Sequence, residues 1–187
     1  MRYHPPMIEA TTTTPDREPH YAQIPREALP ALDRNPIHVV LDNLRSAYNI
    51  GSVFRTGDGG AVAHIHICGF SARPPHKKLE KTALGACDYV PWTYHTHTHD
   101  CLDALRAQGI PIVAVEVTPE AVPYTRFDWP QPVAIVFGHE VDGINAETLA
   151  RCDAVVQIPM RGYKNSMNVA TAFGVLLYGV LQQWNAV

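Results

Sequence analysis

The side chains best suited to chemistry lie at two places where a predicted strand runs into a loop. The first loop follows the apolar run Val133–Phe137 and contains Gly138 and Glu140. The second follows residues 154–159 and leads through residues 160–165 into the last predicted helix. In open α/β sheets, ligands bind outside the carboxyl ends of the strands. Two such loops with small and polar residues therefore predict one shared ligand pocket.

The start of the last helix adds hydrogen-bond donors to this predicted pocket. We expect that helix to begin near Ser166, with Asn165 or Ser166 as its capping residue. The first N–H groups of a helix have no partner within it, and the helix dipole gives this end a partial positive charge. The predicted pocket therefore offers backbone donors as well as side chains.

The segments that position these loops alternate between strands and helices. Six strands are predicted, at residues 38–42, 64–70, 89–94, 110–117, 133–137 and 154–158. Helices are predicted from near Asn49 and Ile50 to the glycines at 57–60, and at residues 78–84, 101–108, 146–151 and 166–184. This alternation predicts an α/β fold with a mostly parallel six-stranded sheet and helices on both faces.

The chain divides into a proline-rich start and one folded domain. Residues 1–36 show no sustained periodicity, and their prolines block helices and sheet ladders. We expect them to form an extended N-terminal arm. Residues 37–187 are long enough to bury one core and are predicted to form a single domain.

Three blocks of residues follow one another in a set order along the chain. They are Asn49-Ile50-Gly51 with Arg55-Thr56, then Phe137-Gly138-x-Glu140-x-x-Gly143, then Ile158-Pro159-Met160-x-Gly162 with Ser166-Met167-Asn168-Val169. Any one block alone is a weak signal. In this order and spacing they resemble the SpoU branch of the SPOUT RNA 2′-O-methyltransferases, over roughly residues 36–185.

The resemblance implies a reaction and an assembly that composition alone does not reveal. It implies S-adenosylmethionine as methyl donor and a ribose 2′-hydroxyl of transfer RNA or ribosomal RNA as acceptor. It also implies a C-terminal trefoil knot, a feature nearly absent among folds, and a homodimer with the active site near the subunit interface. The alternatives are a non-catalytic RNA-binding protein with this fold and another nucleotide-binding enzyme such as a dehydrogenase. The absence of GxGxxG counts against the last.

The resemblance further implies roles for single residues. The residues expected to be catalytic are Arg55, Asn49, Glu140, Ser166 and Asn168. The residues expected to bind the cofactor are Val115, Glu116, Phe137, Gly138, Glu140, Gly143, Ile158, Met160, Ser166 and Met167. The residues expected to bind RNA are Arg45, Arg55, Lys77, Lys78, Arg161 and Lys164. Two positions depart from the common pattern: His139 stands where asparagine is common and Tyr48 where proline is common.

The expected role of Arg55 is that of a cation. A guanidinium keeps its proton, with a pKa above ~12, so it is a poor general base. We expect Arg55 to bind phosphate and to stabilise the developing alkoxide, while the hydroxyl proton goes to phosphate or water. Glu140 is expected to anchor the loop or Arg55. Asn168 has a simpler alternative role, in which it only caps the helix or bridges backbone groups.

Charge is distributed unevenly along the chain. The net charge of −3 and the pI of about 6.3 argue against a strongly basic nucleic-acid-binding domain. Residues 45–81 are locally basic, however: they hold Arg45, Arg55, Arg73, Lys77, Lys78 and Lys81 against Asp58 and Glu80. This window predicts a surface for RNA phosphates, and the alternative is a solvated loop.

The last predicted helix is apolar on nearly all sides. Its apolar residues include Val169, Phe173, Leu176, Leu177, Val180, Leu181 and Trp184. A helix of this kind is usually buried on more than one side. We therefore expect a homodimer, and the alternative is burial of the helix under the N-terminal arm.

The cysteines and histidines do not predict a metal site. The four cysteines form no CxxC pair, which favours reduced buried thiols. His95, His97 and His99 alternate and would share a face of a strand, a pattern that can bind metal. The suspected reaction requires none, so a polar surface run is expected instead. His64 and His66 are interpreted as strand residues rather than ligands.

The chain is expected to be cytoplasmic and not to enter a membrane. Its first residues show no apolar signal segment. The last helix is too short and mixed for a membrane span, which needs about 20 apolar residues.

Overall fold

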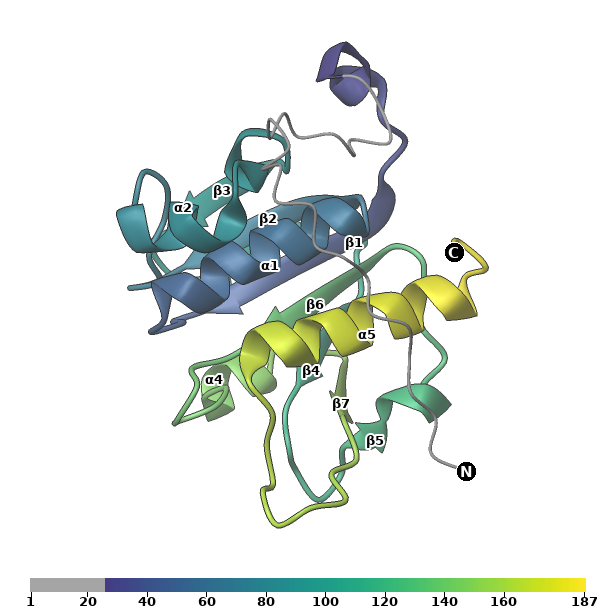
Figure 1. Ribbon diagram of the computed structural model, residues 1–187. Helices are drawn as coiled ribbons and strands as arrows, with labels where there is room; N and C mark the ends of the chain where they lie inside the picture. The colour runs from purple at the N-terminus through teal and green to yellow at the C-terminus, as the bar shows by residue number, and fades with distance from the viewer. Residues whose placement is uncertain (1–25) are drawn as a thin grey trace, which may run out of the picture. The chain divides into compact units, whose positions relative to one another are not determined.

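The computed structural model describes residues 26–187 and divides the chain into two units, residues 1–32 and residues 33–187 (Figure 1). The described part of the first unit is one 3₁₀ helix, η1 (Arg26–Ala31). Most of the predicted N-terminal arm lies outside the described residues. The second unit holds the whole sheet, whose first strand already begins at Asn35.

A parallel sheet of seven strands, not the predicted six, forms the centre of the second unit. The strands are β1 (Asn35–Asp42), β2 (Val62–Cys68), β3 (Trp92–His95), β4 (Ile112–Val115), β5 (Val122–Pro123), β6 (Val133–Phe137) and β7 (Ala154–Gln157). Their order is β3-β2-β1-β6-β4-β7-β5, and every pairing is parallel.

The strand that sequence reasoning missed is β5. It has only two residues, and one of them is Pro123. Proline cannot donate to a sheet ladder, so it is confined to edge strands and strand ends. β5 lies at the edge, paired with β7 alone. A segment of this length and composition carries no periodic signal.

Helices cover both faces of the sheet, as predicted. They are α1 (Ala47–Gly59), α2 (Lys77–Ala83), α3 (Thr98–Ala107), α4 (Ala146–Leu149) and α5 (Val169–Gln183), with the 3₁₀ turns η2 (Ala86–Asp88) and η3 (Tyr124–Arg126). Figure 1 shows α1 and α5 side by side on one face, and the two helices are in contact.

Alternating strand residues divide the core into two layers. Val39 of β1 and Ile135 of β6 belong to the layer formed with α1 and α5. Val40 of β1 belongs to the opposite layer, which includes Leu102 of α3. Side chains alternate between the faces of a strand, so strands buried on both faces appear as continuous apolar runs. This explains why the central strands were predicted from their apolar runs.

The two helices next to the predicted pocket begin at other residues than expected. α1 is capped by Ser46, whose hydroxyl accepts a hydrogen bond from the N–H of Asn49, so Asn49 lies inside the first turn. α5 begins at Val169 and is capped by Asn168, not by Asn165 or Ser166. In both cases several polar residues precede the helix, and sequence alone does not choose among possible caps.

The last helix buries most, but not all, of its apolar surface within the chain. Phe173, Leu176, Leu177, Val180 and Leu181 are fully buried. Tyr178 is 46% exposed. Among residues 26–187, no helix combines the length and the apolar character that a membrane crossing requires.

Candidate active site

A cavity of about 670 Å³ lies where β4, β6 and β7 end and α5 begins. Three segments line it: residues 115–117 after β4, residues 137–143 after β6, and residues 157–172 from the end of β7 into α5. The two loops that the sequence placed in one pocket therefore do meet there. The carboxyl ends of the three strands supply the walls, as expected for an open α/β sheet.

All ten residues predicted to bind the cofactor line this cavity. They are Val115, Glu116, Phe137, Gly138, Glu140, Gly143, Ile158, Met160, Ser166 and Met167. The predicted catalytic residue Asn168 lines it too, as does Lys164, which was predicted to contact RNA. The residues that sequence reasoning did not single out for binding include His139, Val141, Asp142, Gln157, Val169 and Ala172.

A hydrogen-bond network joins all three sequence blocks beside the cavity. The side-chain amide of Asn49 donates to Glu140 Oε1 at 2.8 Å. The side-chain amide of Asn168 donates to Asn49 Oδ1 at 3.0 Å. Asn168 Oδ1 in turn accepts from the N–H groups of Ala170 and Thr171 at the start of α5. Asn49 therefore connects the loop after β6 to the cap of α5.

The carboxylate of Glu140 fixes the start of α1. Its Oε2 accepts a hydrogen bond from the N–H of Arg45 at 2.8 Å, and its Oε1 accepts from the N–H of Ser46 at 3.0 Å. Partial burial acts to raise the pKa of Glu140, but the hydrogen bonds from Arg45, Asn49 and Ser46 outweigh it and hold the pKa below its ordinary value. Of the two expected roles, anchoring the loop is the one these bonds support.

Two glycines allow the loop after β6 to pass close to its neighbours. A Cβ at Gly138 would lie 2.5 Å from Ile144 Cγ1 and 2.6 Å from the carbonyl carbon of Gly143. Gly143 has φ +68°, in the left-handed region that glycine tolerates best, and a Cβ there would collide with the Glu116 carboxylate. That carboxylate accepts from the N–H of Ile144 at 2.8 Å. Space therefore requires glycine at both positions, and conformation requires it at Gly143 as well.

His139 organises the same loop in place of the asparagine common in the resembling family. Its Nδ1 accepts hydrogen bonds from the N–H groups of Val141 at 3.3 Å and Asp142 at 3.1 Å. An asparagine oxygen makes similar bonds to backbone groups two or three residues on. The substitution thus keeps the turn and adds a ring, which Phe70 contacts edge-on.

Arg55, which the sequence predicted to be catalytic, does not line this cavity. It is exposed and lines a separate depression of about 600 Å³ with Ser52, Thr56, Gly59, Lys81, Thr82 and Tyr178. The reason is helical geometry: six residues separate Arg55 from Asn49, which places Arg55 roughly 240° around α1 and about 9 Å along it. Asn49 faces Glu140 and Asn168, and Arg55 faces α2 and α5.

The residues predicted to contact RNA are exposed, and the structure spreads them over several elements. Arg45 precedes α1, Lys77 and Lys78 begin α2, and Arg161 and Lys164 lie in the loop before α5. Tyr163, between the last two, is 101% exposed. Their role in RNA binding stays a prediction.

Comparison with known proteins agrees with this geometry. A model described as the SpoU rRNA Methylase family matches residues 36–178, which include all three blocks. The chain belongs to this family. The resemblance read from the sequence is thereby confirmed, and the second and third motifs of this SpoU family member line the described cavity.

Individual relatives show how this SpoU family member compares in length. It is 28% identical over 145 residues to the tRNA (guanosine(18)-2′-O)-methyltransferase of Thermus thermophilus, covering 78% of this chain and 74% of the relative. The crystal structure of an AdoMet-bound rRNA methyltransferase from Sinorhizobium meliloti matches with a TM-score of 0.75 and 26% identity, over 82% of this chain and 59% of that chain. A structure described as giving insight into the 2-OH methylation of C/U34 on tRNA matches with a TM-score of 0.73 and 26% identity, over 81% of this chain and 97% of that chain.

Proposed function

We propose that this protein transfers the methyl group of S-adenosylmethionine to a ribose 2′-hydroxyl of transfer RNA or ribosomal RNA. The observation that carries this proposal is that the second and third family blocks line one cavity, while Asn49 of the first block is bonded to both of them through Glu140 and Asn168. Family membership and the relatives named above support the reaction class. The alternative, a non-catalytic RNA-binding protein with the same fold, would not need this cavity.

The cavity suits S-adenosylmethionine in size and in chemical character. Its volume falls within the range of small-molecule sites, about 300–1,000 Å³. Phe137, Ile158 and Met160 give it apolar walls, and Gly138 removes a side chain where backbone must approach closely. When bound, S-adenosylmethionine supplies a methyl group carried on a sulfonium sulfur.

The residues of this chain then position the two reactants. The amides of Asn49 and Asn168 are held in fixed orientations by their bonds to Glu140 and to the α5 backbone. Ser166 places an exposed hydroxyl in the cavity wall beside them. Such preorganisation lowers the entropic cost of bringing the hydroxyl oxygen into line with the methyl group.

We also propose that the enzyme is a homodimer in which Arg55 of one copy serves the cavity of the other. The separation of Arg55 from the cavity within one chain supports this arrangement. So does the half-exposed Tyr178 of α5, which borders the Arg55 depression. A trefoil knot formed by the segment around residues 158–168 belongs to the same proposal, because it would bring the three cavity walls together as observed.

Cofactor binding is the first test. Addition of S-adenosylmethionine or its demethylated product should raise the melting temperature of the full chain, whereas NAD should not. If NAD raises the melting temperature, or if none of the three compounds does, the assignment of the cavity is contradicted. Gly162→Ala is a matched control for variants of the cavity, since nothing lies within 4 Å of a Cβ at Gly162.

A mixing experiment tests the shared site. Arg55→Ala and Gly138→Ala should each lose methyl transfer for different reasons. If the two residues act in different copies, mixed subunits will contain one intact site, and partial activity will return. If both residues act in the same chain, mixing will restore nothing, and the proposal of a shared site will be wrong.

A further inference from the structure

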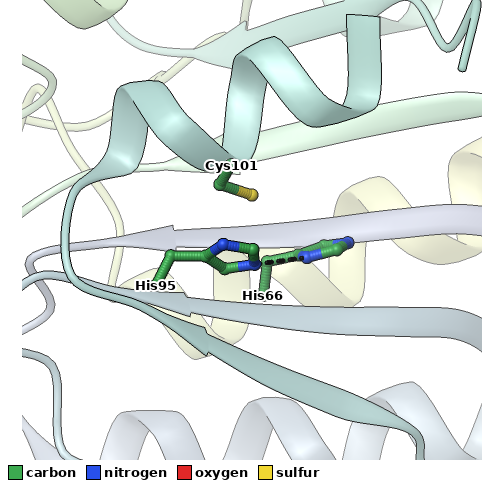
Figure 2. Close-up of side chains that lie close together, drawn as sticks. All are labelled: His66, His95 and Cys101. Atoms are coloured by element: carbon green, nitrogen blue, oxygen red, sulfur yellow. Dashed lines mark hydrogen bonds between the residues drawn. The ribbon is translucent and has the colours of Figure 1, made fainter. Parts of the chain in front are cut away.

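A second group of reactive side chains lies on the sheet away from the cofactor cavity. His66 of β2, His95 of β3 and Cys101 of α3 point toward one another (Figure 2). Their ligand atoms all lie within 4.8 Å of one another. Cys101 is fully buried and the two histidines are half-buried. None of the three lines the cavity described above.

Strand register brings these residues together. In the β2–β3 ladder, His66 pairs with Thr93 and Cys68 pairs with His95, so His66, Cys68 and His95 share one face. α3 covers this face, and its residue Cys101 packs into the same core layer as Cys68. This group of side chains is called the histidine–cysteine cluster below and consists of His66, His95 and Cys101.

The distances are close to those that a tetrahedral ion requires. His66 Nδ1 and His95 Nε2 are 3.1 Å apart. With Zn–N bonds of ~2.0–2.1 Å, tetrahedral geometry separates two nitrogens by about 3.3 Å and a nitrogen from a sulfur by about 3.5 Å. The imidazoles are therefore almost in place, and the sulfur of Cys101 is at most roughly 1.3 Å farther from them than the ion requires.

A third histidine fixes the tautomer that an ion needs. His38 Nδ1 lies 3.1 Å from His66 Nε2. When His66 uses its Nδ1 lone pair for a metal, its proton resides on Nε2 and is donated to His38 Nδ1. Such an outer hydrogen bond orients a metal-bound histidine and strengthens it as a ligand. The histidines can reach this tautomer by shifting protons between their own ring nitrogens, so no proton is lost from the group.

We propose that His66 Nδ1, His95 Nε2 and the thiolate of Cys101 bind one Zn²⁺ ion, with a fourth position open to water. Two imidazoles and a thiolate are ligands that Zn²⁺ prefers, whereas Mg²⁺ and Ca²⁺ prefer oxygen. Binding releases one proton, from the Cys101 thiol, to solvent. The ion would connect α3 to β2 and β3. This proposal differs from the sequence analysis, which predicted no metal site.

The test uses the full chain freed of metal and then supplied with one equivalent of Co²⁺ or Zn²⁺. Co²⁺ should produce a thiolate-to-cobalt charge-transfer band and the visible bands of a tetrahedral site, and Zn²⁺ should abolish them by displacement. Zn²⁺ should also raise the melting temperature, because it binds only the folded state. The proposal is wrong if no such bands appear.

Matched variants assign the site to these residues. Cys101→Ser and His95→Gln should abolish the charge-transfer band while circular dichroism shows an intact fold. Cys152→Ser should keep it, since Cys152 bonds to Thr148 outside the cluster. His97→Gln should keep it as well, although His97 stacks on His99 near the start of α3. A band that survives Cys101→Ser, or that disappears with His97→Gln, would overturn the assignment.

A variant of His38 is expected to weaken metal binding without abolishing it. His38→Ala leaves all three ligands in place but removes the partner of His66 Nε2. Loss of such a partner typically weakens metal binding ~10–100-fold. An unchanged affinity would show that the tautomer argument is wrong.

Discussion

The cofactor cavity and the histidine–cysteine cluster belong to the same sheet but are built in different ways. Loops that leave β4, β6 and β7 form the cavity, so the residues that shape it stand together in short stretches of sequence. Side chains within β2 and β3 and one turn of α3 form the cluster, so its members are spread from His66 to Cys101. A site at strand ends can be recognised from contiguous motifs, whereas a site on a sheet face depends on strand register.

The two regions also differ in how their polar groups are satisfied. Beside the cavity, Glu140 and Asn168 accept hydrogen bonds from backbone N–H groups, which holds the walls in one shape. In the cluster, both nitrogens of His66 bond to other imidazoles. An ion can replace one of these bonds without leaving any backbone group unpaired. The first arrangement suits a preformed pocket, and the second suits a site that adjusts to its ligand.

The largest expected effect comes from filling the space at Gly138. Gly138→Ala places a Cβ 2.5 Å from Ile144 Cγ1, so the loop after β6 must move by roughly 1 Å. A misplacement of that size in an active site can cost about 100-fold in rate. We expect methyl transfer to fall by about that factor and cofactor affinity to fall with it, measured by label transfer and calorimetry. Gly162→Ala should change neither, and equal behaviour of the two variants would contradict the described packing.

The next effect is on stability and concerns Glu140. Glu140→Gln keeps the shape of the side chain but replaces one acceptor oxygen with a donor. Arg45, Ser46 and Asn49 donate to the two oxygens, so at least one donor loses its partner. We expect the free energy of unfolding to fall by about 1 kcal/mol, measured by urea denaturation. Glu147→Gln is the control. Glu147 is exposed, and its ion pair with Arg151, at 3.7 Å, is an exposed pair that contributes little to stability.

Two substitutions of Asn168 separate its cap from its link to Asn49. Asn168→Ala removes both and should lower the free energy of unfolding by about 1 kcal/mol. Asn168→Asp keeps an acceptor for Ala170 and Thr171 but has no donor for Asn49 Oδ1. Asp should therefore retain the stability of α5 while both variants lose methyl transfer. Equal destabilisation by Asp and Ala would show that the link, rather than the cap, stabilises the fold.

The smallest effect is a pH dependence at the same carboxylate. The folded-state pKa of Glu140 lies below its ordinary value, so the unfolded chain binds the extra proton first as the pH falls. The stability from ionised Glu140 is present above the ordinary pKa of ~4.3 and is lost as the pH falls through the folded-state value. The gap in unfolding free energy between wild type and Glu140→Gln should therefore shrink below about pH 4. A gap that widens on acidification would contradict the described hydrogen bonds.

The walls of the cavity could be predicted from sequence because their determinants are local. Every residue predicted to bind the cofactor lines it, and the family that the three blocks indicated is confirmed. The position of Arg55 relative to the cavity could not be predicted in this way. Arg55 lies on another side of α1 from Asn49, and a linear motif does not display helical phase.

The cluster could not be predicted because its determinants are not local. Sequence reasoning considered His95 with His97 and His99, which alternate along the chain. The structure instead places His95 opposite Cys68 and near His66, while His97 and His99 flank the start of α3. Which residues of two parallel strands stand side by side depends on the pairing register, and one residue of slip changes the face. The edge strand β5 was missed for a related reason: its two residues become a strand only by pairing with β7.

Methyl transfer from labelled S-adenosylmethionine into purified transfer RNA and, separately, ribosomal RNA tests the central claim most directly. We expect label in one pool, recovered as a 2′-O-methylated nucleoside, with wild-type protein but not with Arg55→Ala. Arg55→Lys should recover little activity if the planar guanidinium is required and most of it if a positive charge suffices. Label in neither pool, from protein that binds the cofactor, would contradict the proposed reaction and favour the RNA-binding alternative.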